Sequence, residues 1–361
     1  MIICCGEALI DMIQGEGSKE TPPSVRSDST AKAVKRMAYR PLPGGCPFNT
    51  AIAIGRMGVP VKFFGRFSTD FFGEILVKRL LDNKVGDDLM IRTPQNTTLA
   101  FVKTEKGKEP VYVFYSEGTA GCSLIAGDLP KKLPPDTRCI AFGSIAMTVE
   151  PVASTIEAMI QRENALQGIG KDPPVISFDP NVRPFMIKDK KAYTRQFEKC
   201  VAASTIAKIS AADFEYVYPG LELEKALHKI IAMGPRMVIS TQGPKGAVAM
   251  LRRNDGSIVR ASAPVVNLPV IDTIGAGDTF HGAFLSWLEI HDKMSRISLA
   301  ILKETEISEA LYFANKAASL VCTKQGADPP TLKEVTALKE ASAKTAAKAP
   351  AKKPQAGVKK K

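Results

Sequence analysis

The stretch Asp272-Thr273-Ile274-Gly275-Ala276-Gly277-Asp278-Thr279-Phe280 decides how this chain folds. The apolar run at residues 265–271 predicts a strand before it. Phe280, Phe284 and Leu288 follow at a spacing of four residues, which places them on one face of a helix. The two glycines therefore lie where a strand turns into a helix, and there the free N–H groups of the helix N-terminus can bind an anion.

Asp278 lies in the first turn of that predicted helix, beside any anion that the loop binds. A carboxylate repels a phosphate, so its presence suggests another task, such as accepting the proton of an attacking hydroxyl group. A second interpretation stays open, in which the stretch is a tight turn and Asp278 only stabilises the helix start. The stretch alone does not decide between them.

The composition of the 361-residue chain, 45% hydrophobic, is that of a globular protein with one main domain. No apolar run reaches the ~18 residues of a membrane helix. The start at Met1–Cys5 has no basic region and predicts a first strand, not a signal peptide. Seven cysteines, an odd number, and three histidines show no metal-ligand spacing. We therefore expect reduced cysteines in a cytoplasmic protein.

The net charge of +12 is concentrated at one end of the chain. Lys339–Lys361 holds eight lysines and one glutamate, which gives this segment +7 and leaves +5 for the remainder. We predict that residues 334–361 form a disordered tail, because large apolar side chains are almost absent from it. Such a polycation can contact nucleic acid nonspecifically, or it can be a solvated tail without a partner.

Strand and helix signals alternate along the rest of the chain, which favours a parallel sheet covered by helices on both faces. A hairpin at residues 98–115 breaks this rhythm and predicts a small separate sheet, whereas Ser18–Tyr39 reads as a loop. Several polar residues follow strands or begin helices, where one cleft can collect them. These are Asp11, Gly44-Gly45, Asp179, Ser210, Thr241 and the Gly275–Asp278 loop. The strands are expected at residues 2–5, 61–65, 139–142, 175–178, 206–209 and 237–241.

Two motifs together resemble the signatures of the PfkB (ribokinase-like) carbohydrate kinases. They are Gly44-Gly45-x-x-x-Asn49 and Asp272-Thr273-x-Gly275-Ala276-Gly277-Asp278. The resemblance covers residues 1–333, except for a longer and more polar 18–39 segment. Within the family, residues 6–11, 142–145 and 179–183 are most similar to bacterial fructokinases.

The resemblance implies an α/β fold, a three-layer α/β/α sandwich with a mainly parallel sheet and a small β lid. It also implies ATP-dependent phosphorylation of a sugar primary hydroxyl, with D-fructose converted to fructose 6-phosphate. Asp278 would be the general base, and the backbone of Gly275, Ala276 and Gly277 would form the anion hole.

On the sugar side, the resemblance implies hydrogen bonds from Asp11 and Asn49, with the sugar lying against Gly44-Gly45. Arg183 would contact substrate or phosphate, although a surface salt bridge is an open alternative. Turn capping by Asp11, a solvated helix face for Asn49 and simple loop flexibility at the glycines are the corresponding structural alternatives.

On the nucleotide side, Thr241-x-Gly243-x-x-Gly246 matches the nucleotide-loop pattern, and it can also be an ordinary β-turn. Asn315 would lie near adenine. The family's Asn-x-x-Glu motif, associated with Mg²⁺ and phosphate, is altered here to Ser210-x-x-Asp213. The implied cofactors are ATP and Mg²⁺, and a K⁺ site near Asp272 and Ile274 follows from the family alone.

The lid implied by the resemblance consists of residues 98–115 and part of 12–40. It would cover the sugar, exclude water and pair two subunits as a homodimer. Phe101 would line its inner face against the substrate, with packing inside the lid as the alternative.

Three other classes of function are compatible with parts of the sequence. A PfkB kinase of ribose, 2-keto-3-deoxygluconate or a nucleoside would share the same signatures. A dinucleotide-dependent oxidoreductase would need Gly-x-Gly-x-x-Gly after the first strand, and the sequence lacks it there. A nucleic-acid-associated protein acting through its tail would not need the intact Gly275–Asp278 loop.

Overall fold

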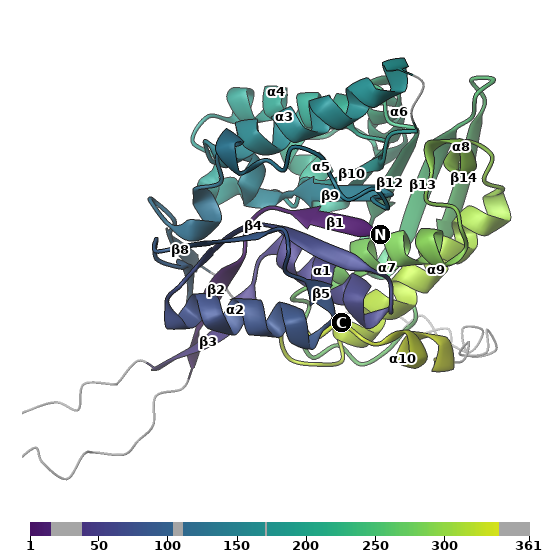
Figure 1. The fold of residues 1–361 in the computed structure, drawn as a ribbon. Helices are drawn as coiled ribbons and strands as arrows, with labels where there is room; N and C mark the ends of the chain where they lie inside the picture. Colours follow the sequence, from purple (N-terminus) through teal and green to yellow (C-terminus); the bar gives the residue numbers. More distant parts are fainter. Residues whose placement is uncertain (16–37, 104–110, 170–171, 339–361) are drawn as a thin grey trace, which may run out of the picture.

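The computed structural model describes residues 1–15, 38–103, 111–169 and 172–338. They form three layers, with a twisted sheet between two sets of helices and a smaller sheet to one side (Figure 1). The predicted α/β sandwich with a mainly parallel sheet and a β lid is therefore confirmed.

The central sheet has ten strands in the order β14-β13-β12-β11-β10-β9-β1-β4-β5, with β6 paired to β4. Neighbours from β12 to β5 run parallel, and β13 and β14 add an antiparallel edge. The carboxyl ends of the parallel strands thus meet along one edge of the sheet. The strands are β1 Ile2–Cys5, β4 Val61–Ser68, β5 Val85–Gly86, β6 Met90–Thr93, β9 Cys139–Gly143, β10 Val175–Asp179, β11 Ile206–Ser210, β12 Met237–Thr241, β13 Ala247–Arg252 and β14 Ile258–Ala263.

Each central strand contributes to two cores, because alternate side chains point to opposite faces of a sheet. Ile2 and Cys4 of β1 pack in the core with α1, α2, α7 and α9, whereas Ile3 and Cys5 pack in the core with α3, α4, α5 and α6. The helices are α1 Cys46–Arg56, α2 Phe71–Asp82, α3 Val152–Ala165, α4 Lys190–Ala203, α5 Ala211–Val217, α6 Leu223–Ala232, α7 Ala276–Ile290, α8 Arg296–Ala300, α9 Glu304–Val321 and α10 Leu332–Ala337.

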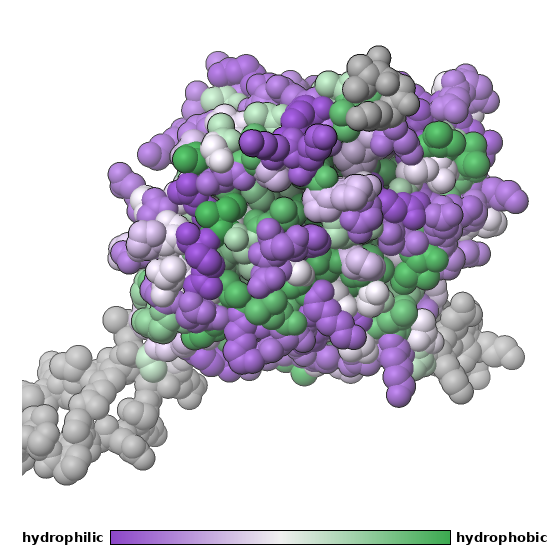
Figure 2. Space-filling model, viewed as in Figure 1, coloured by the Kyte–Doolittle hydropathy of each residue, from purple (hydrophilic) through white to green (hydrophobic). Residues whose placement is uncertain are grey.

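The outer surface is polar over most of the face seen in Figure 2, with apolar groups visible between the charged ones. Within the described residues, no helix combines the length and apolar character that crossing a bilayer requires.

The lid is a four-stranded sheet in the order β3-β2-β7-β8, with β3 Ala38–Gly44, β2 Leu9–Gly15, β7 Thr98–Lys103 and β8 Val111–Tyr115. The hairpin predicted at residues 98–115 is confirmed as the antiparallel pair β7 and β8. The lid also contains β2 and β3, so part of residues 12–40 belongs to it as expected, although β3 itself was not predicted as a strand. Pro41 and Pro43 of β3 are tolerated there because β3 is an edge strand.

The strand predicted at residues 265–271 is wrong. β14 ends at Ala263, and the residues that follow have no regular secondary structure. The N–H groups of Ile271 and Asp272 both donate to the Cys322 carbonyl at the end of α9. The Ile271 side chain is 69% exposed. The apolar run is thus attached to a helix end and not to the sheet.

Two further boundaries are corrected. Asp11 lies inside β2 of the lid and does not simply follow the end of the first strand. Residues 334–337 are not part of a disordered tail, because α10 extends to Ala337 and Val335 is buried. Residues 339–361, and residues 18–37 of the predicted loop, lie outside the described residues, whereas Ala38 and Tyr39 at the end of that loop belong to β3.

Candidate active site

The predicted glycine turn leads directly into α7. Gly275 has a left-handed backbone (φ 75°), and a Cβ atom there would lie 2.7 Å from the Ala327 Cβ. The Ala276 N–H donates to the Thr273 carbonyl at 3.2 Å, so it is less available than predicted. Within the described residues, the N–H groups of Gly277 and Asp278 have no protein acceptor. These two donors at a helix N-terminus fit a phosphate group.

Asp278 is held in place by α1. Asn49 Nδ2 donates to Asp278 Oδ2 at 2.8 Å, and the Cys46 thiol also hydrogen-bonds this carboxylate. Thr50 Oγ1 donates to the Asp278 backbone carbonyl at 3.4 Å. Burial raises the pKa of Asp278, while the hydrogen bonds from Asn49 and Cys46 oppose that rise. The carboxylate is therefore oriented and more basic than in water, as a proton acceptor requires.

The paired glycines bring the lid up to this carboxylate. Gly45 precedes α1 with φ 112°, and a Cβ atom at Gly44 would lie 2.3 Å from Asp11 Oδ2. Asp11 therefore reaches the site only because residue 44 has no side chain. Burial raises the pKa of Asp11 to about 6; Arg183 lowers it and Asp278 raises it. Asp11, Arg183 and Asp278 thus lie close enough to interact electrostatically.

Arg183 lies on the loop that follows β10. Its Nη1 donates to Asn181 Oδ1 at 2.6 Å and to the Val182 carbonyl at 3.2 Å. Asn181 has a left-handed backbone (φ 37°), and its N–H donates to Asp179 Oδ1 at 3.2 Å. This loop carries a charged side chain toward Asp11 and ties it to the end of β10.

An ion pair lies beneath the glycine turn. Lys208 Nζ donates to Asp179 Oδ2 at 2.8 Å, and both side chains are at most 4% exposed. A Cβ atom at Gly277 would lie 3.2 Å from Lys208 Nζ. Burial lowers the pKa of Lys208, but Asp179 and Asp213 raise it, and the net shift is upward. Lys208 is therefore charged.

Two further polar residues were missed by sequence reasoning. His281 Nε2 hydrogen-bonds Ser177 Oγ at 2.7 Å, and burial lowers the His281 pKa to about 3, so the ring is neutral. Glu7 Oε2 accepts the Ala146 N–H at 3.2 Å. Burial raises the pKa of Glu7 to about 7, although hydrogen bonds from Ser144 and the backbone oppose the rise.

The altered Ser210-x-x-Asp213 motif forms a capping box at the start of α5. The Ser210 hydroxyl accepts the Asp213 N–H, and Asp213 Oδ2 accepts the Ser210 N–H at 2.9 Å. Asp213 Oδ1 accepts the Val182 N–H at 2.8 Å. Both carboxylate oxygens therefore already have protein donors, which fits contact with Mg²⁺ through water and not direct coordination.

The other residues predicted to bind the nucleotide lie near the antiparallel edge of the sheet. Thr241 pairs in register with Ser210, and Gly243 (φ 54°) and Gly246 (φ 88°) form the turn between β12 and β13. A Cβ atom at Gly246 would lie 2.2 Å from the Ala263 carbonyl oxygen. Asn315 Nδ2 donates to the Ala263 and Pro264 carbonyls, both at 3.0 Å, so its amide nitrogen braces this chain segment.

Asp272 and Ile274 support the glycine turn. Asp272 Oδ1 accepts the Ile274 N–H at 3.0 Å, and Oδ2 accepts the Gly326 N–H at 2.9 Å. The carboxylate thus links the turn to the segment after α9. The described contacts give this pair a structural role, and a K⁺ site there remains an expectation.

Phe101 does not face the substrate side, which corrects its predicted role. Asp11 pairs with Ala100, and Ala100 pairs with Phe114, so these side chains share the inner face of the lid. Phe101 lies on the opposite face, with Tyr39 and Tyr115 at ring distances of 5.2 and 5.5 Å. Successive residues of a strand point to opposite faces of the sheet, so Ala100 holds the inward position and its neighbour Phe101 points outward.

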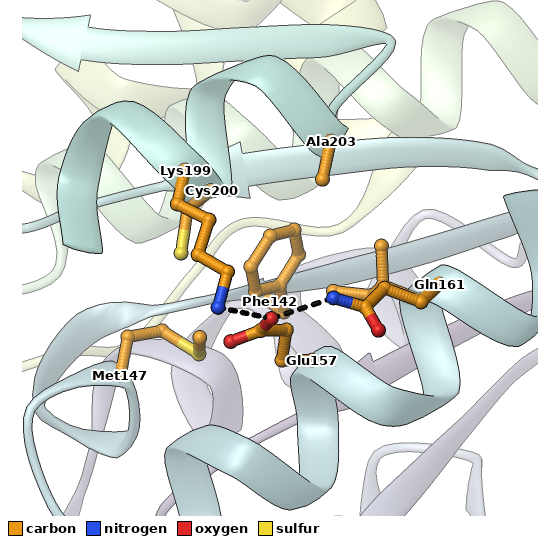
Figure 3. Close-up of a pocket in the computed structure, with 8 residues that line it drawn as sticks. Phe142, Met147, Glu157, Gln161, Lys199, Cys200 and Ala203 are labelled. Carbon is orange, nitrogen blue, oxygen red and sulfur yellow. Dashed lines mark hydrogen bonds and ion pairs between the residues drawn. The ribbon is translucent and has the colours of Figure 1, made fainter. Parts of the chain in front are cut away.

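A small apolar cavity of about 30 Å³ lies elsewhere, between α3 and α4. Figure 3 shows Lys199 of α4 and Gln161 of α3 both directed at Glu157 of α3, with the Phe142 ring and Met147 nearby. None of the predicted site residues lines this cavity. It has room for about one water molecule and not for a sugar.

Comparisons with known proteins identify the family of this chain. A family model for pfkB family carbohydrate kinases matches residues 1–334. The chain is 35% identical over 309 residues to a fructokinase of Rhizobium leguminosarum bv. trifolii, with 84% of each chain covered. It is 28% identical over 345 residues to fructokinase-1 of Zea mays, covering 94% of this chain and 98% of the relative.

Solved structures show the same fold. A fructokinase with bound ATP from Xylella fastidiosa has a TM-score of 0.78 at 23% identity, with 93% of this chain and 96% of that chain covered. A fructokinase double mutant from Vibrio cholerae O395, in a form bound to fructose, ADP and potassium ion, has a TM-score of 0.74 at 23% identity, with 93% and 97% covered. The chain therefore belongs to the pfkB family of carbohydrate kinases.

Proposed function

We propose that this protein transfers the γ-phosphoryl group of ATP to the terminal primary hydroxyl of D-fructose, giving fructose 6-phosphate and ADP. One observation carries the proposal. The buried Asp278 carboxylate lies at the start of α7 together with the N–H groups of Gly277 and Asp278, which have no acceptor among the described residues. A proton acceptor and an anion site are thus adjacent, as phosphoryl transfer requires.

The reaction follows from this arrangement. Asp278 takes the proton of the attacking hydroxyl, and the hydroxyl oxygen forms a bond to the γ-phosphorus. The bond between that phosphorus and the oxygen bridging to the β-phosphate breaks, and ADP leaves with the electron pair. The N–H groups at the start of α7 stabilise the charge on the transferred group.

The sugar would lie between α1 and the lid. Asn49 already orients Asp278, so it would position the base as well as a sugar hydroxyl. Asp11 reaches the same place over Gly44. A hydroxyl that fails to reach these buried polar groups would leave them unpaired, which is the physical basis for choosing one sugar over another.

Mg²⁺ would neutralise charge on the ATP phosphates. Asp213, whose oxygens already accept protein hydrogen bonds, would contact the hydrated ion through water. The turn between β12 and β13 would accommodate the nucleotide at Gly243, where the space beside the backbone is open, whereas Gly246 lets the turn pack closely against the Ala263 carbonyl.

We also propose a homodimer formed through the outer face of the lid. This face carries Tyr39, Phe101 and Tyr115 in edge-to-face contact, and Val113 and Tyr115 are 51% and 60% exposed. An exposed aromatic cluster on a sheet is typical of an interface.

All seven cysteines are free thiols, which supports a reducing, cytoplasmic location.

A sugar panel tests the proposed activity. ADP release would be measured by a coupled assay with fructose, ribose, 2-keto-3-deoxygluconate and adenosine at saturating ATP and Mg²⁺. We expect the highest kcat/KM for fructose. A higher kcat/KM for one of the other three would overturn the choice of substrate, and no ADP release with any acceptor would overturn the kinase activity itself.

A further inference from the structure

The buried lysine beneath the glycine turn has no place in the mechanism described so far. Lys208 is the single charged residue of β11, and its side chain points to the α7 face of the sheet together with that of Ile206. Asp179 is its lateral neighbour, because Phe178 of β10 pairs in register with Ala207. The register thus places a carboxylate and an ammonium group side by side, directly below α7.

The position of the ammonium is specific. It lies 2.8 Å from Asp179 Oδ2 and 3.2 Å from the place a Gly277 Cβ would occupy. Ligand atoms of Asp179, Asp278 and Cys46 lie within 4.8 Å of one another. The charge of Lys208 is therefore next to the general base and to a peptide unit of the anion site.

The buried charges around the site would otherwise oppose phosphate binding. Asp179, Asp213 and Asp278 are all buried, and His281 is neutral. Lys208 is the buried cation among them, and it interacts electrostatically with all three aspartates. A polyphosphate approaching three carboxylates in a site of low polarity gains from each positive charge, because such charges are poorly screened there.

We propose that Lys208 is a positioning residue for phosphoryl transfer, oriented by Asp179. Its ammonium supports the Gly277 turn from below and places a fixed positive charge behind the anion site. It thereby favours the charged, transferring phosphoryl group and keeps the Asp278 carboxylate in its ionised form. This inference rests on the proposed function and adds a residue pair to it.

The competing interpretation is that Lys208 and Asp179 form a purely structural ion pair. Variants of this pair distinguish the two interpretations. Removing one partner of a buried ion pair destabilises a protein, whereas replacing both by neutral groups often does not. Lys208→Met should therefore lower the unfolding temperature, and the double variant Lys208→Met/Asp179→Asn should recover it. Lys62→Met, which removes a partner of the surface pair with Asp88 at 2.6 Å, is the control.

The experiment compares these variants in two ways. The first is kcat and KM for fructose and ATP. The second is the affinity for MgADP with aluminium fluoride, a mimic of the transferring phosphoryl group, against the affinity for MgADP alone. The second measurement needs no turnover, and it is made with and without sugar, so a wrong choice of sugar would not affect it.

We expect the double variant to unfold near the wild-type temperature but to lose about 100-fold in kcat and in affinity for the fluoride complex, as on removal of an oxyanion-hole donor. Affinity for MgADP alone should change less than about threefold. A double variant with wild-type kcat and wild-type affinity for the fluoride complex would overturn the proposal. Wild-type protein that binds the fluoride complex but does not phosphorylate fructose would instead refute the proposed substrate.

Discussion

Buried carboxylates are the feature that most distinguishes this site at the level of single residues. Burial raises the pKa values of Glu7, Asp11 and Asp278, and each carboxylate is oriented by neighbouring groups. Asp278 is proposed to accept the proton of the attacking hydroxyl, and Asp11 is proposed to hydrogen-bond the sugar. Glu7 instead links the Ala146 backbone to the start of α1, so its role is structural.

The buried Glu7 predicts a pH dependence of stability. Its folded-state pKa of about 7 lies above the ordinary 4.5, so the native state holds this proton more tightly than the unfolded state. The resulting stabilisation is complete below about pH 4.5 and is lost as the pH rises through about 7. Between pH 5 and 8, the unfolding free energy of the wild type should fall relative to that of Glu7→Gln, by up to about 3 kcal/mol.

Urea unfolding followed by circular dichroism measures this difference. Glu309→Gln makes the same chemical change at an exposed position and is the control. Parallel pH profiles for the wild type and Glu7→Gln would contradict the assignment of a buried, proton-binding glutamate.

Sequence reasoning located Asp278 and Asn49 because each belongs to a local motif with a recognisable spacing. It missed Lys208, although a lysine inside the otherwise buried strand β11 was a usable signal, since unpaired lysines are rarely buried. Its partner Asp179 lies 29 residues away. The sequence does not reveal such a pairing, because it depends on which strands become neighbours.

At the level of elements, the lid contains both a success and two errors. The hairpin of β7 and β8 was predicted because β-branched and aromatic residues form two separate runs. β3 was missed, since Pro41 and Pro43 argue against a strand until its place at a sheet edge is known. Phe101 was assigned to the wrong face of the lid. Only the pairing of β7 with β2 shows that Ala100, one residue earlier, faces inward.

The outer face of the lid predicts the oligomeric state. Tyr115→Glu would place a charge in the proposed interface, where it would be buried without a partner. The variant should therefore be monomeric where the wild type is dimeric, with an unchanged circular dichroism spectrum. Size-exclusion chromatography with light scattering measures the mass.

Ile297→Lys, at a 70% exposed position on α8, is the control and should leave the dimer intact. A Tyr115→Glu variant with the mass of a dimer would place the interface elsewhere, and a monomeric wild type would remove it.

For the whole molecule, the sheet and its two helical layers were predictable because the strands are short apolar runs between helical patterns. The site forms where β10, β11, α1, α7 and the lid meet, and no local pattern specifies that meeting. The segment before α7 is an example. The apolar residues Val270 and Ile271 predict a strand, but the Ile271 N–H hydrogen-bonds to the end of α9 and not to the sheet.

We predict that stability and kinase activity do not depend on the basic tail, whereas any binding to nucleic acid does. Lys339–Lys361 lacks core-forming residues, so its removal should leave the unfolding midpoint and the sugar kinase activity nearly unchanged. Any binding of the full-length chain to nonspecific DNA should weaken with salt and be lost on truncation. A large drop in the unfolding midpoint after truncation would show instead that this segment packs against the body.

The general base is the central claim, and Asp278→Asn tests it most directly. Asn keeps the volume and can still accept from Asn49 Nδ2, but it cannot take the substrate proton. We predict a fall of about 10²–10⁴-fold in the single-turnover rate, with the circular dichroism spectrum and the affinities for sugar and ATP little changed. If Asp278 served only as a helix-start residue, Asn would replace it without loss. A rate within about threefold of the wild type, too small a loss for removal of a general base, would contradict the mechanism proposed for this protein.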